Sequence, residues 1–217
     1  MAHWAVFDVD GTLLPGTSME KMFLWELIRR GEIPWQNMAY FLSHGIYTLV
    51  RTRSWDVLKG SKLYLRGLSK QRVTHLAEWY FRRYIVGRLS RRGMMEVRHH
   101  RTRGFRILYL SGSPEFLIRC LQQQEPADYW LAAQPEVKQG MFTGALARPH
   151  PYGRQKKTYL LQLQHALDID FSRSIVFANH HSDVHHMEMF GQAVAVNPTA
   201  RLRQIARRRG WPIAVWD

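Results

Sequence analysis

Two aspartates that directly follow a short apolar strand constrain this chain more than any other feature. Residues 3–7 are apolar enough for a buried strand, and Asp8, Asp10 and Gly11 come next. Carboxylates this close repel each other, and each needs hydration or a cation. Because open parallel α/β sheets bind ligands where their strands end, the pair indicates a site for a hard cation such as Mg²⁺. A turn with solvated aspartates is the alternative.

Strands and helices alternate along most of the chain, which predicts a parallel sheet with right-handed crossovers and helices on both faces. After the first strand, further strands are expected over 105–110, 129–133, 174–178 and 193–196, and an extended segment over 211–216. Helices are expected over 116–124, 155–167 and 201–209. Residues 136–146 read as a hairpin that turns around Gln139-Gly140-Met141.

Residues 17–89 contain no convincing strand and read as a helical insertion between the first two strands. Helical spacing of apolar residues is expected over 19–30, 36–51, 54–65 and 69–87, with Ser69 as a helix N-cap. A further helix over 89–103 leads back to the sheet, with His99 and His100 at its exposed end.

Composition excludes some classes of protein. Hydrophobic residues make up 46% and charged residues 22% of 217, which excludes a disordered chain. The net charge of +14 favours anionic partners. It suits a small phosphorylated substrate or peripheral contact with an anionic membrane, and it also fits solvated basic helix faces. No nucleic-acid recognition module is visible, which argues against specific nucleic-acid binding.

Cys120 is the single cysteine, so an internal disulfide is ruled out and a reducing compartment is favoured. Its apolar surroundings indicate a buried thiol. The sequence begins without a secretory signal pattern and has no run of about 20 apolar residues. We therefore expect a cytoplasmic protein, and the sequence does not indicate its oligomeric state.

Two further candidate sites for binding phosphate lie later in the sequence, at Ser111-Gly112 and at Lys156. Ser111 and Gly112 come after the second strand, where a hydroxyl and free N–H groups make a phosphate cradle. A plain helix N-cap is the alternative reading of Ser111. Lys156 follows Gly153 and would offset the paired carboxylates and hold phosphoryl oxygens. Alternatively it is an ordinary surface lysine, and Lys157 is the candidate one residue away.

The run FDVDGTLL around Asp8 and Asp10 resembles the first signature of the haloacid dehalogenase (HAD) phosphohydrolase superfamily. Ser111-Gly112-Ser113 is similar to its second signature, and Lys156 to the third signature of subfamily IB, which includes phosphoserine phosphatases. The resemblance implies a Rossmann-like α/β core over 1–16 and 90–217. It also implies a helical cap over 17–89, which covers the active site and selects the substrate.

The resemblance further implies a Mg²⁺-dependent phosphomonoesterase that acts through an aspartyl-phosphate. Asp8 would be the nucleophile and a Mg²⁺ ligand. Asp10 would be the acid and base, with its backbone carbonyl on the metal. Ser111, Gly112 and Lys156 would hold the phosphoryl group of a small phosphorylated metabolite.

The fourth signature departs from the family pattern Gly-Asp-Ser-x-x-Asp. Residues 178–183 read Ala-Asn-His-His-Ser-Asp, so Asn179 stands at the position of a metal-binding acid. Its neutral carbonyl can still bind a hard cation, with weaker affinity than Asp. Asp183 fits the second acidic position and would support the metal site. The alternatives are a catalytically weakened binding or regulatory protein, and a phosphatase for lipid phosphates.

Four histidines surround this last signature, namely His180, His181, His185 and His186. They could contact substrate beside the catalytic groups, above all His180 and His181, bind a transition metal, or be plain surface residues. Their spacing is not a zinc pattern, because no Cys or Glu completes it. Substrate selection is expected from the cap, with these candidates: Thr17, Glu20, Met22, Phe23, Arg51 and Arg53.

Overall fold

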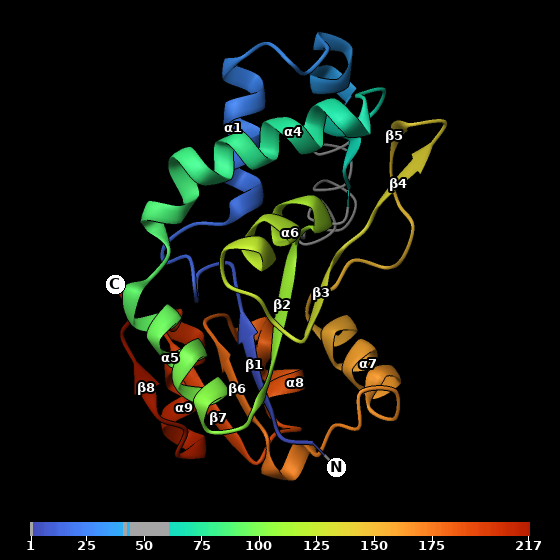
Figure 1. The fold of residues 1–217 in the computed structure, drawn as a ribbon. Coiled ribbons are helices and arrows are strands. Elements are labelled where there is room, and N and C mark those ends of the chain that lie inside the picture. The colour runs from blue at the N-terminus through green and yellow to red at the C-terminus, as the bar shows by residue number, and fades with distance from the viewer. Residues whose placement is uncertain (1, 41–42, 44–60) are drawn as a thin grey trace.

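The computed structural model describes residues 2–40, 43 and 61–217. Its centre is a six-stranded sheet in the order β3-β2-β1-β6-β7-β8, with every neighbouring pair parallel (Figure 1). The strands are β1 (Trp4–Asp8), β2 (Arg106–Pro114), β3 (Tyr129–Ala133), β6 (Ile175–Ala178), β7 (Gln192–Val196) and β8 (Ile213–Ala214). The parallel α/β architecture expected from the alternation of elements is confirmed.

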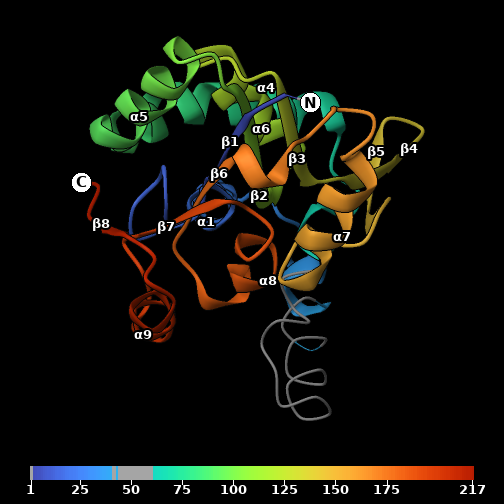
Figure 2. The same cartoon turned by 90° about the horizontal axis from the view of Figure 1, so that it is seen from below.

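Helices cover both faces of the sheet (Figure 2). One face carries α5 (Arg91–Thr102) and α6 (Glu115–Gln124), and the other carries α7 (Arg154–Leu163), α8 (Val184–Met187) and α9 (Ala200–Arg209). Successive side chains of a strand point to opposite faces. Phe7 of β1 therefore packs in the first layer, and Val6 in the second. This double burial explains why β1 is apolar throughout.

The cap begins with α1 (Met19–Arg29), and α4 (Lys70–Tyr80) lies beside it (Figure 1). Ser18 and Ser69 cap these helices by accepting hydrogen bonds from backbone N–H groups three residues on. The chain then continues from α4 through a π-helical turn, η2 (Phe81–Ile85), and a 3₁₀ turn, η3 (Val86–Arg88). The helix expected over 69–87 is therefore helical throughout but changes type after α4.

The other two cap helices are only partly described. Residues 35–40 are helical, in agreement with the expectation for 36–51. The 3₁₀ turn η1 (Leu63–Leu65) stands at the end of the segment expected to be helical over 54–65. The remainder of both expectations, together with Arg51 and Arg53, lies outside the described residues. The cap boundaries, 17–89, stay a prediction.

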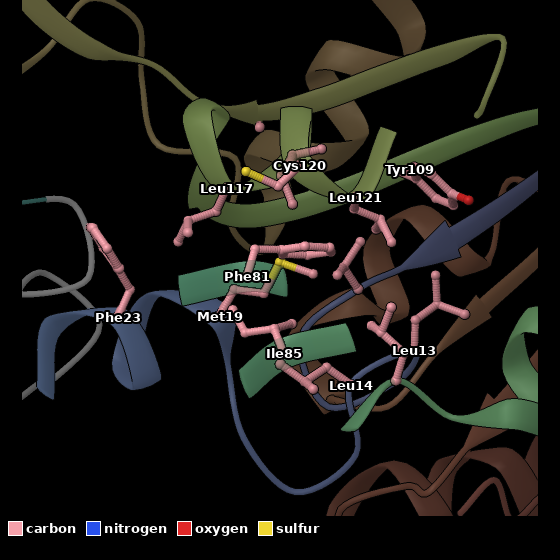
Figure 3. Close-up of a cluster of buried hydrophobic side chains, with 14 of the residues drawn as sticks. Leu13, Leu14, Met19, Phe23, Phe81, Ile85, Tyr109, Leu117, Cys120 and Leu121 are labelled. Atoms are coloured by element: carbon pink, nitrogen blue, oxygen red, sulfur yellow. The ribbon is translucent and has the colours of Figure 1, made fainter. Parts of the chain in front are cut away.

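One hydrophobic cluster joins the cap to the sheet (Figure 3). Phe23 of α1 packs edge-on against Phe116 of α6, with 5.7 Å between the ring centroids. Phe81 and Ile85 of η2 belong to the same buried cluster as Leu117. Because α1, η2 and α6 all contribute buried side chains to this one cluster, the described cap elements pack directly on the core.

A small hairpin is hydrogen-bonded to the cap. It consists of β4 (Pro135–Lys138) and β5 (Met141–Leu146), joined by Gln139 and Gly140, which both have positive φ, as a tight hairpin turn requires. The hairpin expected from the sequence is confirmed. The Phe142 N–H donates to the Leu68 carbonyl at 2.9 Å, so β5 is hydrogen-bonded to the segment that precedes α4.

Three local expectations were wrong. Strand β2 runs to Pro114, beyond the expected turn at residue 111, and α7 ends at Leu163 instead of 167. His100 is buried, because the last turn of α5 presses its ring edge-on against Phe177, at 5.3 Å. Burial lowers the pKa of His100, so the residue is a neutral core aromatic.

In the described part of the chain, no helix is long and apolar enough to cross a bilayer.

The burial of Cys120 leads to a reactivity prediction. Burial and, secondarily, the charge of Glu78 raise the pKa of the Cys120 thiol to about 12. Since the thiolate is the reactive form, we expect the native protein at pH 8 to react with a disulfide reagent at least about a hundredfold more slowly than the unfolded chain. Absorbance of the released thiol, with and without guanidinium, measures both rates. Comparable rates would contradict the buried placement.

Candidate active site

Strand register brings the predicted site residues to one edge of the sheet. Asp8, the last residue of β1, pairs with Leu110 of β2, so Ser111 follows directly beside it. On the other side, Phe7 pairs with Phe177 of β6, and Asn179 comes two residues later. The carboxyl ends of the three central strands therefore carry the candidate residues, at the point where the strand order reverses around β1.

A buried lysine holds two of the carboxylates together. The Lys156 ammonium donates to Asp8 Oδ1 at 2.7 Å and to Asp183 Oδ1 at 2.8 Å, and all three side chains are buried. The Thr12 hydroxyl donates to the other oxygen of Asp8 at 2.9 Å. Lys157, the alternative lysine, is exposed. Of the two candidates, the structure brings Lys156 to the carboxylates.

The electrostatics of this trio are incompletely balanced. Burial raises the pKa of Asp8 to about 7, and repulsion from Asp183 adds to the rise, although Lys156 opposes it. Burial also works against the Asp183 carboxylate, but Lys156 outweighs it and holds that pKa below its usual value. For Lys156, burial disfavours the ammonium, yet the two carboxylates raise its pKa. One cation therefore faces more negative charge than it neutralises.

Asp10 is oriented by three donors. Its carboxylate accepts from the Ser111 hydroxyl at 2.6 Å, from the Ser113 hydroxyl at 2.9 Å and from the backbone N–H of Met19 at 2.8 Å. The last bond comes from the first residue of α1. Ser113 Oγ also accepts from the N–H of Glu20 at 3.2 Å. Asp10 is therefore fixed between the end of β2 and the start of the cap.

The Ser111 hydroxyl, which was predicted to bind phosphate, is engaged in hydrogen bonds within the protein. Ser111 is buried, and its hydroxyl donates to Asp10 while accepting the N–H of Ser113 at 2.9 Å. Ser111 is neither a plain helix N-cap nor an open hydroxyl, since it lies within β2. The Gly112 carbonyl lies 3.1 Å from His150 Nε2, and a Cβ on this glycine would lie 3.0 Å from His150 Cε1. A larger residue at position 112 would press against the His150 ring.

Asn179 lies against the aspartate loop. A Cβ at Gly11 would fall 2.1 Å from Asn179 Nδ2, and Gly11 has a φ of +86°, so only glycine fits there. The Asn179 amide is thus brought beside the residue that follows Asp10. Carboxylate, amide and backbone carbonyl oxygens are the donors that a hard cation such as Mg²⁺ takes, and the uncompensated charge of the trio favours one. These residues fit the metal chemically.

The histidines do not form a metal centre. In the described ranges no group of three or more His, Cys, Asp or Glu side chains could hold a metal ion. The half-buried rings of His180 and His181 lie 4.1 Å apart next to Asn179. His186 is buried 3.9 Å from Asp183, and neither ring nitrogen has a hydrogen-bond partner among the described residues. Burial lowers the pKa of His186 to about 3, so its ring is neutral.

Two contributors were missed by sequence reasoning. Thr12 orients Asp8 from within the first motif, four residues later. Ser113 binds Asp10, and its spacing of two residues from Ser111 on a strand was a usable signal.

Among the cap candidates, Phe23 is buried in the core and cannot reach substrate. The carboxylate of Glu20 accepts two bonds from the buried Lys62 ammonium, at 2.6 and 2.7 Å, and one from the Tyr64 hydroxyl at 2.8 Å. This contact ties the segment around η1 to the first turn of α1.

The chain is similar to proteins that are already known. The family model described as haloacid dehalogenase-like hydrolase matches residues 5–188. The chain is 27% identical over 214 residues to the phosphoserine phosphatase SerB1 of Mycobacterium tuberculosis, covering 96% of this chain and 69% of the relative. It is 24% identical to the histidinol-phosphatase of Neisseria meningitidis, covering 98% of both chains.

A solved structure has the same fold. A Bordetella pertussis protein described as having unknown function superposes with a TM-score of 0.82 at 21% identity, covering 99% of this chain and 98% of that one. At this identity the likeness concerns the fold alone.

The Lys156 trio leads to a stability prediction with a matched control. Lys156→Met leaves two buried carboxylates without a cation, so we expect a loss of about 3–5 kcal/mol in the free energy of unfolding. The same change at the exposed Lys157 should cost less than about 0.5 kcal/mol. Urea unfolding at pH 8 measures both. Without Lys156 both carboxyl groups of the folded protein would have higher pKa values and take up protons more readily, so the loss should shrink as the pH falls toward 5. Equal effects of the two substitutions would contradict the assignment.

Proposed function

The chain belongs to the haloacid dehalogenase-like hydrolase family, and we propose that it hydrolyses small phosphomonoesters through a covalent phosphate on Asp8. The observation that carries the proposal is the buried Lys156 that binds Asp8 and Asp183, with Asp10 held by three donors at the same sheet edge. Such a set of oriented carboxylates and a lysine suits phosphoryl transfer better than it suits stability.

In the first step, an Asp8 oxygen attacks phosphorus while the bond from phosphorus to the ester oxygen breaks. Asp10 donates its proton to the leaving oxygen, and the alcohol departs. In the second step, Asp10 takes a proton from water, the water oxygen attacks phosphorus, and the bond to Asp8 breaks. Inorganic phosphate leaves, and both carboxyl groups return to their starting forms.

The hydrogen bonds support these roles. Thr12 and Lys156 each hold one oxygen of Asp8, which limits the rotation of the nucleophile. Lys156 also supplies positive charge where phosphoryl oxygens gain negative charge. For Ser111 to bind the phosphoryl group, its hydroxyl has to turn away from Asp10. We infer that substrate binding exchanges this bond for one to phosphate, with the Gly112 N–H as a second donor.

Mg²⁺ is the proposed cofactor. Asp8, the backbone carbonyl of Asp10 and the Asn179 side chain would hold it, and Asp183 would support it through Lys156. When bound, the ion supplies positive charge that lets an anionic phosphate approach Asp8. The position of Asn179 beside Gly11 supports its part in this set.

The names of two relatives support a substrate class. Their names state activity on phosphoserine and on histidinol phosphate. We propose a small phosphorylated metabolite and place these two esters first in a substrate panel. His180 and His181, half-buried beside Asn179, are the proposed contacts to the leaving group. Cytoplasmic location stays a prediction that rests on the single cysteine.

The nucleophile prediction concerns Asp8→Asn. The amide cannot accept phosphorus as the carboxylate does, so we expect hydrolysis of an aryl phosphate to fall by at least roughly a thousandfold. The same substitution at Asp217, exposed at the chain end, is the matched control and should retain the full rate. Thermal melting confirms that both variants are folded. A folded Asp8 variant with near-normal turnover would refute the mechanism.

A second prediction concerns the metal. Asn179→Asp adds a negative charge to the proposed ligand set, so the Mg²⁺ concentration for half-maximal activity should fall by about three- to tenfold. Titration of Mg²⁺ against aryl phosphate hydrolysis measures it. An unchanged or higher requirement would remove Asn179 from the set. Inactivity of the unaltered protein at saturating Mg²⁺ would favour the weakened binding protein instead.

A further inference from the structure

Exposed aromatic side chains gather on the cap. Trp25 of α1 and Trp35 of the helical segment 35–40 are 72% and 77% exposed. The described chain has eleven exposed large hydrophobic residues, and six of them belong to the cap: Trp25, Ile28, Trp35, Tyr40, Trp79 and Tyr84. Such a concentration of uncovered apolar surface marks an interaction site.

Ring contacts make part of this set continuous across two helices. The Arg30 guanidinium lies 4.1 Å from the Trp79 ring centroid, which joins α1 to α4. The Trp79 and Tyr84 rings meet edge to face at 5.6 Å, and the Arg83 guanidinium lies 5.3 Å from Tyr84. Trp25 lies on α1 one turn after Lys21. We call this surface, formed by Lys21, Trp25, Arg29, Arg30, Trp79, Arg83 and Tyr84, the cap face.

The cap face is positively charged, and the acidic residues beside it are already paired. Glu26 is buried and accepts hydrogen bonds from both Arg29 and Arg30. Glu32 accepts two bonds from Arg72. Lys21 and Arg83 are exposed and add positive charge. The surface therefore offers a partner aromatic rings set among cations, on a chain with a net charge of +14.

We propose that the cap face docks on an anionic membrane surface. Trp and Tyr rings favour the interface between water and lipid because each has an apolar body and a polar edge. Lysine and arginine near such a surface are attracted to anionic headgroups. Trp25, the most exposed ring of the cap face, projects from α1, which suits insertion between headgroups. A single-stranded nucleic acid would stack its bases on aromatic rings that line a basic groove, whereas Trp25 is 72% exposed on the surface of a helix.

Docking through α1 has a consequence for the active site. The first N–H of α1 binds Asp10, so the cap face and the catalytic groups share one short helix. A membrane-docked chain would hold its site near phosphate esters at the lipid surface. That choice of substrate rests on the proposed function, whereas the docking itself does not.

The test measures co-sedimentation of the full chain with vesicles of phosphatidylcholine, with and without phosphatidylglycerol. We expect binding only with phosphatidylglycerol, weakening as salt rises. Lys21→Gln combined with Arg83→Gln should lower the partition coefficient by roughly thirtyfold. Trp25→Ala should lower it several-fold.

The matched control removes the same charge elsewhere. Arg203→Gln combined with Arg207→Gln alters two exposed residues of α9, at the far end of the molecule from α1 (Figure 1). This pair should change vesicle binding less than about threefold. All variants should melt normally and hydrolyse aryl phosphate at the full rate.

Three outcomes would overturn the proposal. They are binding that is absent or indifferent to phosphatidylglycerol, equal losses in the cap and α9 variants, and tight binding of single-stranded or duplex DNA that depends on the cap face. Each is independent of phosphatase activity, so a failed activity assay and a failed docking test can be told apart.

Discussion

The buried ion trio of Lys156, Asp8 and Asp183 is the interaction on which the site depends. Removing three charges from water is costly, and only close, well-oriented contacts offset that cost. Those contacts form only if β1, α7 and the loop after β6 are positioned accurately relative to one another. The packing of α7 on its face of the sheet therefore brings one lysine to two carboxylates.

A second constraint links the chemistry to the cap. Asp10 accepts a bond from the first N–H of α1, and the Ser113 hydroxyl connects Asp10 to Glu20. Glu20 in turn binds Lys62 and Tyr64, close to η1. The orientation of the proposed acid and base is thus coupled to the cap, since a shift of α1 would break bonds to Asp10. This coupling gives a physical basis for substrate-dependent positioning of Asp10.

Sequence reasoning predicted most of the fold and named candidate residues that the structure brings to one sheet edge, and its failures have physical causes. Asp8, Asp10 and Asp183 could be placed at one sheet edge because their motifs follow strands, and strand ends converge in a parallel sheet. Lys156 was singled out by its spacing after Gly153 and by the family resemblance. The internal bonds of Ser111 were not found, because a hydroxyl can serve as an N-cap, a phosphate ligand or a partner of Asp10, and only its neighbours decide. His100 was misplaced, because whether the last turn of a helix faces solvent depends on what it packs against.

By itself, the sequence determined the alternation of strands and helices, the insertion after the first strand and the placement of acidic residues at a strand end. These follow from local apolar periodicity and chain order, which need no knowledge of distant contacts. Only the tertiary structure decided between Lys156 and Lys157. It also placed Asn179 against Gly11 and left the aromatic rings of the cap face exposed. Each of these three features depends on how a helix is rotated or on how segments far apart in the chain approach each other. The free energy of burying apolar surface across the whole core determines both the rotation and the approach.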